Sequence, residues 1–168
     1  MRVIEKTVFK FEELEESIQE KVIRDWRIND EYFWYHENAD TLKAIENLFG
    51  IKVDYSYGDR DSFIKFSGLC IDEDISPVEF FLDIHSLDDW KDINENWKLT
   101  GYYMDSCFSP VIELLETGIG EIEDTIQDVL YEWLGYCQKD FEFWLSEESI
   151  LEEIQIGEYE FYEDGNLY

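Results

Sequence analysis

Four acidic residues stand at spacings of three, four and four in the second half of the sequence. They are Glu121, Asp124, Asp128 and Glu132, and no lysine or arginine interrupts them. On an α-helix this spacing places all four carboxylates on one face, and a rise of about 1.5 Å per residue spreads them over about 16 Å. Phosphates repeat about every 3.4 Å along each strand of a nucleic acid duplex. A rigid row of this kind predicts a surface that a phosphate-binding protein accepts in place of nucleic acid.

Two further acidic clusters extend the predicted partner-binding set. Glu147 and Glu148 follow Ser146 at a predicted helix start, and Asp72, Glu73 and Asp74 form a run in a predicted loop. A charged face opposite an apolar face is also what any exposed amphipathic helix has. The row therefore indicates a binding surface only when it is considered together with the net charge of the whole chain.

The chain carries far more negative charge than solubility requires. It has 42 Asp and Glu against 13 Lys and Arg, a formal net charge of −29, whereas a net magnitude of about 2–8 keeps a small domain soluble. Residues 1–66 carry a net charge of −5, and residues 67–168 carry −24. Adaptation to salt would acidify the whole surface, so the asymmetry favours a basic partner that faces the acidic region.

The amino-acid composition also limits which ligands the protein is expected to bind and in which cellular compartment it is expected to occur. Apolar residues make up 45% and aromatic residues 17% of the chain, which is typical of a folded protein rather than an acidic disordered one. Such a surface repels free nucleic acid and anionic lipid, so neither is an expected ligand. Three cysteines without CxxC spacing, no apolar membrane span and no opening signal segment predict a cytoplasmic protein.

Candidate catalytic and metal-binding residues are few. His36 and His85 stand in no known ligand or catalytic spacing, and the three cysteines lack the close pairs of a zinc site. The stretch "DEDISPVEFFLD" resembles the start of a calcium loop, but Pro77 takes the place of the required glycine. We therefore expect no enzyme activity, no metal and no cofactor.

Hydrophobic periodicity predicts about five or six helices. Their expected ranges are 11–27, 31–49, a short helix after Ser76-Pro77, another after Ser109-Pro110, 119–145, and one after Ser146. Tyr35 and Ile119 are expected to lie on the helix faces that pack into the protein core. Ser76 with Glu79 has the pattern of a capping box, and Gly50 and Gly118 are expected to end helices.

Alternating apolar and polar residues predict a small antiparallel sheet. The stretches "IKVDYSY" and "SFIKFSG" flank the turn sequence "GDRD" and predict a hairpin. The stretches "RVIEKTVFKF", "WKLTGYYM" and "EYEFYEDGNLY" are further strand candidates. No linker or low-complexity tract interrupts the chain, so we predict a single α+β domain over residues 1–168.

Two long stretches resemble a known group of proteins. The opening "VFKFEELEESIQEKVIRDWRINDEYFWYHENADTLKAIENLFGIKV" and the close "KDFEFWLSEESILEEIQIGEYEFYEDGNLY" are similar to the two ends of phage-encoded acidic proteins that are often labelled antitoxins. Residues 68–118 lie outside this resemblance. It implies a small cytosolic protein of a phage or mobile element, and it brings no catalytic residues with it. Size and charge are also similar to those of DNA-mimicking anti-CRISPR and antirestriction proteins.

These observations predict a phage-type anti-defence inhibitor. It would bind the basic nucleic-acid channel of a host nuclease or CRISPR effector in the host cytoplasm, in an oligomeric state that the sequence does not fix. Two alternatives remain open: an antitoxin that neutralises a basic toxin by direct binding, and an acidic phage protein with a structural or regulatory role.

Overall fold

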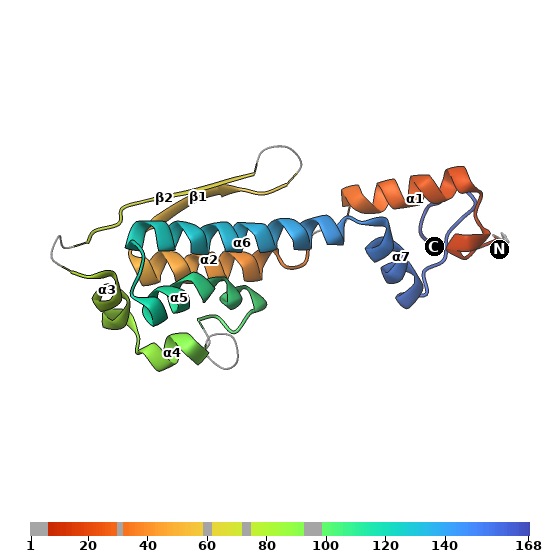
Figure 1. The fold of residues 1–168 in the computed structure, drawn as a ribbon. Coiled ribbons are helices and arrows are strands. Elements are labelled where there is room, and N and C mark those ends of the chain that lie inside the picture. The colour runs from red at the N-terminus through yellow and green to blue at the C-terminus, as the bar shows by residue number, and fades with distance from the viewer. Residues whose placement is uncertain (1–6, 30–31, 59–61, 72–74, 93–98) are drawn as a thin grey trace, which may run out of the picture. The chain divides into compact units, whose positions relative to one another are not determined.

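A computed structural model describes residues 7–29, 32–58, 62–71, 75–92 and 99–168 (Figure 1). Within these ranges the chain forms seven α-helices, two 3₁₀-helices and one two-stranded antiparallel sheet. The predicted α+β class is confirmed, with one helix more than expected. The contacts of the chain group into two compact units, which we call the terminal unit (residues 1–32 and 141–168) and the central unit (residues 33–140).

The central unit contains most of the regular structure. Its elements are α2 (Tyr35–Phe49), β1 (Lys52–Ser56), β2 (Phe63–Ser67), α3 (Pro77–Ile84), α4 (Leu87–Lys91), the 3₁₀-helix η3 (Tyr103–Phe108), α5 (Ser109–Thr117) and all but the last four residues of α6 (Ile122–Trp144). Figure 1 shows the hairpin running along one side of the α2–α6 pair and α5 lying on the other side.

The predicted hairpin is present, and its inner face packs on α6. β1 and β2 pair antiparallel, with Asp54 opposite Lys65. The rings of Tyr55 and Tyr57 contact the fully buried indole of Trp133 at centroid distances of 5.1 and 6.1 Å. Because side chains alternate along a strand, the other face of β1 carries the exposed charged residues.

Local signals fix the helix ends as the sequence predicts. Gly50 and Gly118 adopt left-handed conformations, with φ of 66° and 67°, directly after α2 and α5. Only glycine takes this conformation without a steric penalty. At the start of α3, the Ser76 hydroxyl accepts a hydrogen bond from the Glu79 backbone N–H, and the Glu79 carboxylate accepts one from the Ser76 N–H at 3.0 Å. The Ser76 hydroxyl also donates to the Glu79 carboxylate at 2.8 Å, and this hydrogen bond, together with the one from the Ser76 backbone N–H, lowers the pKa of Glu79.

The core of the central unit lies between α2, α6 and the α3–α5 segment. Trp133 on α6 donates its indole N–H to the backbone oxygen of Asn38 on α2 at 3.2 Å. Phe49 contacts Phe81 and Phe108 at centroid distances of 5.6 and 6.1 Å. These fully or nearly fully buried side chains fix the rotation of α6 about its axis, and hence which of its residues face solvent.

The terminal unit brings the two ends of the chain together. It holds the 3₁₀-helix η1 (Phe11–Glu13), α1 (Glu16–Asn29) and α7 (Glu147–Ile156). Phe9 and Phe161 form an antiparallel bridge with N···O distances of 2.8 and 2.9 Å. The buried core of this unit consists of Phe11, Leu14, Val22, Ile23, Ile150, Ile154 and Phe161.

Several local predictions are wrong. Tyr35 is 51% exposed at the first turn of α2. Ile119 is 81% exposed, because it lies between Gly118 and Gly120, which both have positive φ, and α6 begins only at Ile122. Residues 99–104 of "WKLTGYYM" contain no strand and lead instead into η3.

The chain ends also differ from prediction. The single helix predicted over residues 11–27 is divided into η1 and α1, because Leu14 has an extended backbone conformation. The C-terminal segment forms isolated bridges, Phe161 to Phe9 and Phe161 to Leu167, instead of a strand. Residues 2–6 of the predicted opening strand lie outside the described residues, and within residues 7–11 only Phe9 forms a bridge. None of the helices within the described ranges is long and apolar enough to span a membrane.

Candidate protein-interaction surface

The acidic residues at the start of α6 are exposed, with Glu121 directly before the helix and Asp124 and Asp128 in its first two turns. Glu121, Asp124 and Asp128 are all exposed, and we call these three residues the acidic row. Successive members are separated by about 4.5 and 6 Å of helix rise. The opposite side of α6 places Ile126, Val129 and Leu130 in the core with no exposed surface, so the helix holds the three carboxylates toward solvent.

Glu132, the fourth predicted member, has a different environment. Its side chain is half-buried, and its carboxylate accepts a hydrogen bond from the Ser109 hydroxyl at 2.9 Å. Ser109 begins α5, a helix with no acidic residue in its first turn and no side-chain cap. A carboxylate at this position complements the partial positive charge of a helix N-terminus. Glu132 therefore joins α6 to α5, and this contact is a structural role that the spacing alone did not reveal.

The ion pairs that the described residues form do not include the acidic row. Among the described residues, none of the salt bridges includes Glu121, Asp124 or Asp128. The lysines of the central unit that form ion pairs do so elsewhere: Lys43 and Lys52 pair with Glu46, and Lys65 pairs with Asp54. The charge of the row is thus available to a partner.

The other two predicted clusters lie in a different unit from the row or outside the described residues. Glu147 and Glu148 are exposed in the first turn of α7, where Ser146 caps the helix by accepting a hydrogen bond from the Ser149 N–H at 3.2 Å. They belong to the terminal unit, and the acidic row belongs to the central unit. Asp72, Glu73 and Asp74 lie outside the described residues.

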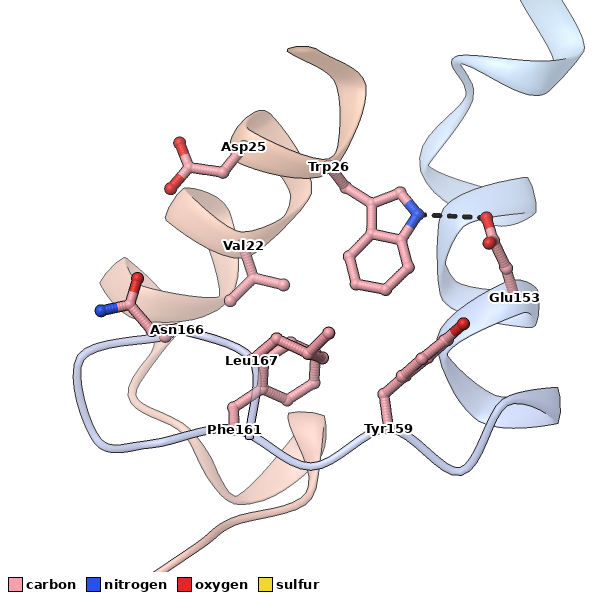
Figure 2. Close-up of a pocket in the computed structure, with 9 residues that line it drawn as sticks. Val22, Asp25, Trp26, Glu153, Tyr159, Phe161, Asn166 and Leu167 are labelled. Atoms are coloured by element: carbon pink, nitrogen blue, oxygen red, sulfur yellow. Dashed lines mark hydrogen bonds between the residues drawn. The ribbon is translucent and has the colours of Figure 1, made fainter. Parts of the chain in front are cut away.

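A groove of about 410 Å³ lies in the terminal unit (Figure 2). Figure 2 shows the Trp26 indole donating a hydrogen bond to the Glu153 carboxylate, at 3.0 Å. The Trp26 ring also meets the Tyr159 ring edge to face, with centroids 5.1 Å apart. Asp25, a second acidic residue of the groove, forms salt bridges with Lys21 and Arg24 at 3.7 Å. Both carboxylates of this groove therefore already have partners.

A second cavity, of about 400 Å³, lies in the central unit, and we call it the aromatic cavity. It is bounded by the start of α2, by the segment that leads into η3, and by the C-terminal part of α6. The side chains that define its chemistry are those of Trp34, Glu37, Tyr102, Tyr103, Tyr136 and Asp140. Sequence analysis missed this site, because its residues come from three separated segments. The aromatic runs "YFWY" and "GYYM" were the only local signal.

The three cysteines and His85 lie outside these surfaces. Cys107 and Cys137 are fully buried, and burial raises the pKa of both thiols. Cys70 is exposed. His85 follows the last turn of α3 and meets the Trp90 ring at 5.5 Å. Within the described parts of the chain, no group of three or more His, Cys, Asp or Glu side chains could hold a metal ion.

Comparison with known proteins gives no relative. No protein-family model, curated protein or solved structure matches this chain.

Proposed function

We propose that this protein is a phage-type anti-defence inhibitor. It binds the basic nucleic-acid channel of a host nuclease or CRISPR effector in the host cytoplasm, and it excludes the substrate by occupying the channel. The observation that carries this proposal is the acidic row at the start of α6: three exposed carboxylates that take part in none of the ion pairs formed by the described residues, beside a helix face that is fixed in a core.

The spacing and the net charge support the same proposal. The carboxylates repeat at about 4.5 and 6 Å along α6, which is comparable to the repeat of phosphates along a nucleic acid strand. Residues 67–168 carry a net charge of −24, so a basic groove experiences a strong attractive field before contact. Electrostatic steering of this kind raises association rates and weakens steeply with salt.

Charge reversal of the acidic row tests the proposal. The variant with Glu121→Lys, Asp124→Lys and Asp128→Lys is compared with a control in which Asp83, Glu113 and Glu116, exposed residues of α3 and α5, are changed to Lys. Both variants change the net charge by the same amount. Each is used, with the unchanged protein, to capture partners from host lysate, and the captured proteins are eluted with stepwise salt.

The expected result is specific to the row. The unchanged protein and the control retain a nucleic-acid-cleaving partner that elutes as salt rises and whose activity they inhibit, and the row variant does neither. Equal inhibition by the row variant would refute the assignment to α6. Equal loss in both variants would show that only total charge matters, which also refutes it. Circular dichroism of each variant establishes that the helices are retained.

An antitoxin is the second candidate. The two stretches that resemble phage proteins labelled antitoxins meet in the terminal unit, where they supply α1, α7 and the Phe9–Phe161 bridge. In this alternative the terminal unit contacts the toxin. Co-expression with toxins encoded beside the gene distinguishes the two: rescue of growth that survives reversal of the acidic row, without inhibition of any nuclease, favours the antitoxin.

A further inference from the structure

The aromatic cavity combines the two kinds of group that recognise an organic cation. Trp34 and Tyr103 present exposed rings, 38% and 76% exposed, and the Tyr103 ring meets that of Tyr136 edge to face at 5.5 Å. The carboxylates of Glu37 and Asp140 line the same space. Aromatic faces attract cations through the ring quadrupole, and a carboxylate at the edge supplies a charge-assisted hydrogen bond.

One wall of the cavity is held in place by a buried carboxylate. Asp105 is only 4% exposed, and it accepts hydrogen bonds from the Thr100 hydroxyl at 2.8 Å and from the Gly101 N–H at 2.9 Å. The Thr100 hydroxyl also contacts that of Thr41 on α2 at 3.1 Å. These contacts fix the turn that presents Tyr102 and Tyr103, so the cavity is formed before any ligand arrives.

We propose that the aromatic cavity binds an arginine side chain of the basic partner. Guanidinium is planar, stacks on aromatic faces and is more weakly hydrated than ammonium, so it loses less hydration than lysine in a space lined mainly by rings. Its fork of N–H donors suits carboxylates at the edge. The volume of about 400 Å³ accommodates a long side chain and lies in the range of small ligand sites.

The position of the cavity on α6 links it to the acidic row. Tyr136 and Asp140 follow Asp128, the last member of the acidic row, by eight and twelve residues, about 12 and 18 Å of helix rise. Lysines and arginines that lie along the acidic row thus belong to a partner surface that also reaches the cavity. This inference rests on the proposed function for the identity of the partner, but the chemistry of the cavity can be tested without the partner.

The groove of the terminal unit is a weaker candidate for the same ligand. Its Glu153 already accepts the Trp26 indole N–H, and its Asp25 is already paired with Lys21 and Arg24. A cation entering that groove would compete with these partners. The aromatic cavity, in contrast, lies in the same unit as the acidic row, and the arginine site is assigned to it on that ground.

The test uses the full chain and a pair of small probes that differ in charge. N-acetyl-arginine amide is titrated into ¹⁵N-labelled protein, and N-acetyl-citrulline amide, which is neutral and nearly the same shape, serves as the matched probe. We expect the arginine probe to shift the Trp34 indole N–H and the Gly101 amide signals. We expect the citrulline probe to bind at least about tenfold more weakly, because it loses the cation–π and charge-assisted contacts.

Variants separate the cavity from general charge attraction. Tyr103→Leu, at a site that is mostly exposed and outside the core, and Glu37→Gln should each weaken the arginine probe several-fold. Asp128→Asn removes a charge from the acidic row without touching the cavity, and it should leave the probe affinity unchanged. Equal binding of the citrulline probe, shifts confined to the acidic row, or unchanged affinity in Tyr103→Leu would overturn the inference. If the probe binds but no nuclease is captured, the proposed function fails and the arginine site stands.

Discussion

Neutralising Asp128 should stabilise the protein, even though it removes a charge from the proposed binding surface. Asp128 lies in the second turn of α6, four residues from both Asp124 and Glu132. Like charges at this spacing destabilise a helix by about 0.2–0.5 kcal/mol per pair. Asp124 lies in the first turn, where the helix N-terminus favours an acidic side chain, but Asp128 lies beyond this region. Asp128→Asn therefore relieves two repulsive pairs, and should stabilise the fold by about 0.4–1 kcal/mol at low salt.

Urea unfolding at two salt concentrations measures this effect. The gain should be clear at about 0.01 M salt, where charges interact over about 30 Å, and should nearly vanish at about 1 M, where they interact over about 3 Å. Glu132→Gln is the matched control: it relieves only one of these repulsive pairs and weakens the charge-assisted contact with Ser109, so we expect it to be less stable than Asp128→Asn at low salt and less stable than the unchanged protein at high salt. A loss of stability in Asp128→Asn at low salt, or a gain that salt does not change, would refute the reasoning. A salt-sensitive gain means that folding does not require the acidic row.

Three further predictions concern other parts of the chain. Gly135 lies inside α6, and a methyl group at its Cα would meet no packing neighbour within 4 Å. Gly135→Ala should therefore raise the free energy of unfolding, measured by urea titration, by about 0.5–1 kcal/mol. A loss of stability would contradict this. Only Cys70 is exposed, so the folded protein should react quickly with one equivalent of a thiol reagent such as dithionitrobenzoate, and two or three fast equivalents would contradict the buried state of the others. Burial of the Glu46 carboxylate acts to raise its pKa, but the Val53 N–H and two lysines outweigh this and lower it below the usual 4.5, so the ionised form is favoured in the fold. The stability that Glu46 contributes is then fully present above about pH 4.5 and is lost as pH falls through the lowered pKa; the difference in urea midpoint between the unchanged protein and Glu46→Gln should shrink from pH 6 to pH 3, and a growing difference would contradict the assignment.

The parts of the fold that depend on local chemistry could be predicted from the sequence. Gly50 and Gly118 end their helices because a left-handed residue is needed there, and the Ser76–Glu79 box starts α3 through two hydrogen bonds within four residues. The hairpin followed from alternation around a turn sequence. Each of these signals is complete within a short stretch, so no distant contact is needed to interpret it.

The parts that depend on distant contacts could not be predicted. The stretch "GYYM" has the composition of a strand, but Asp105 binds the Thr100 hydroxyl and the Gly101 N–H and turns the chain into η3. The terminal unit forms because Phe9 pairs with Phe161, although the two residues lie at opposite ends of the chain. No periodicity within either segment signals that meeting.

The acidic row illustrates both cases. Its spacing predicted one shared helix face; Asp124 and Asp128 are exposed on α6, and Glu121 is exposed at the residue directly before it. The same spacing gave no sign that Ser109 would bind Glu132, because the start of α5 reaches that side of α6 only in the folded chain. The aromatic cavity was missed for the same reason, since Trp34, Tyr103 and Tyr136 come from three different elements.

Competition between this protein and nucleic acid for one partner tests the central claim most directly. A captured nuclease is bound to a fluorescent oligonucleotide, and the protein is added at fixed salt while anisotropy is recorded. We predict that the protein displaces the oligonucleotide completely, that the required concentration rises in proportion to added oligonucleotide, and that the variant with Lys at positions 121, 124 and 128 displaces none. A stable complex of nuclease, oligonucleotide and this protein, formed without displacement, would contradict the claim that these carboxylates take the place of phosphates.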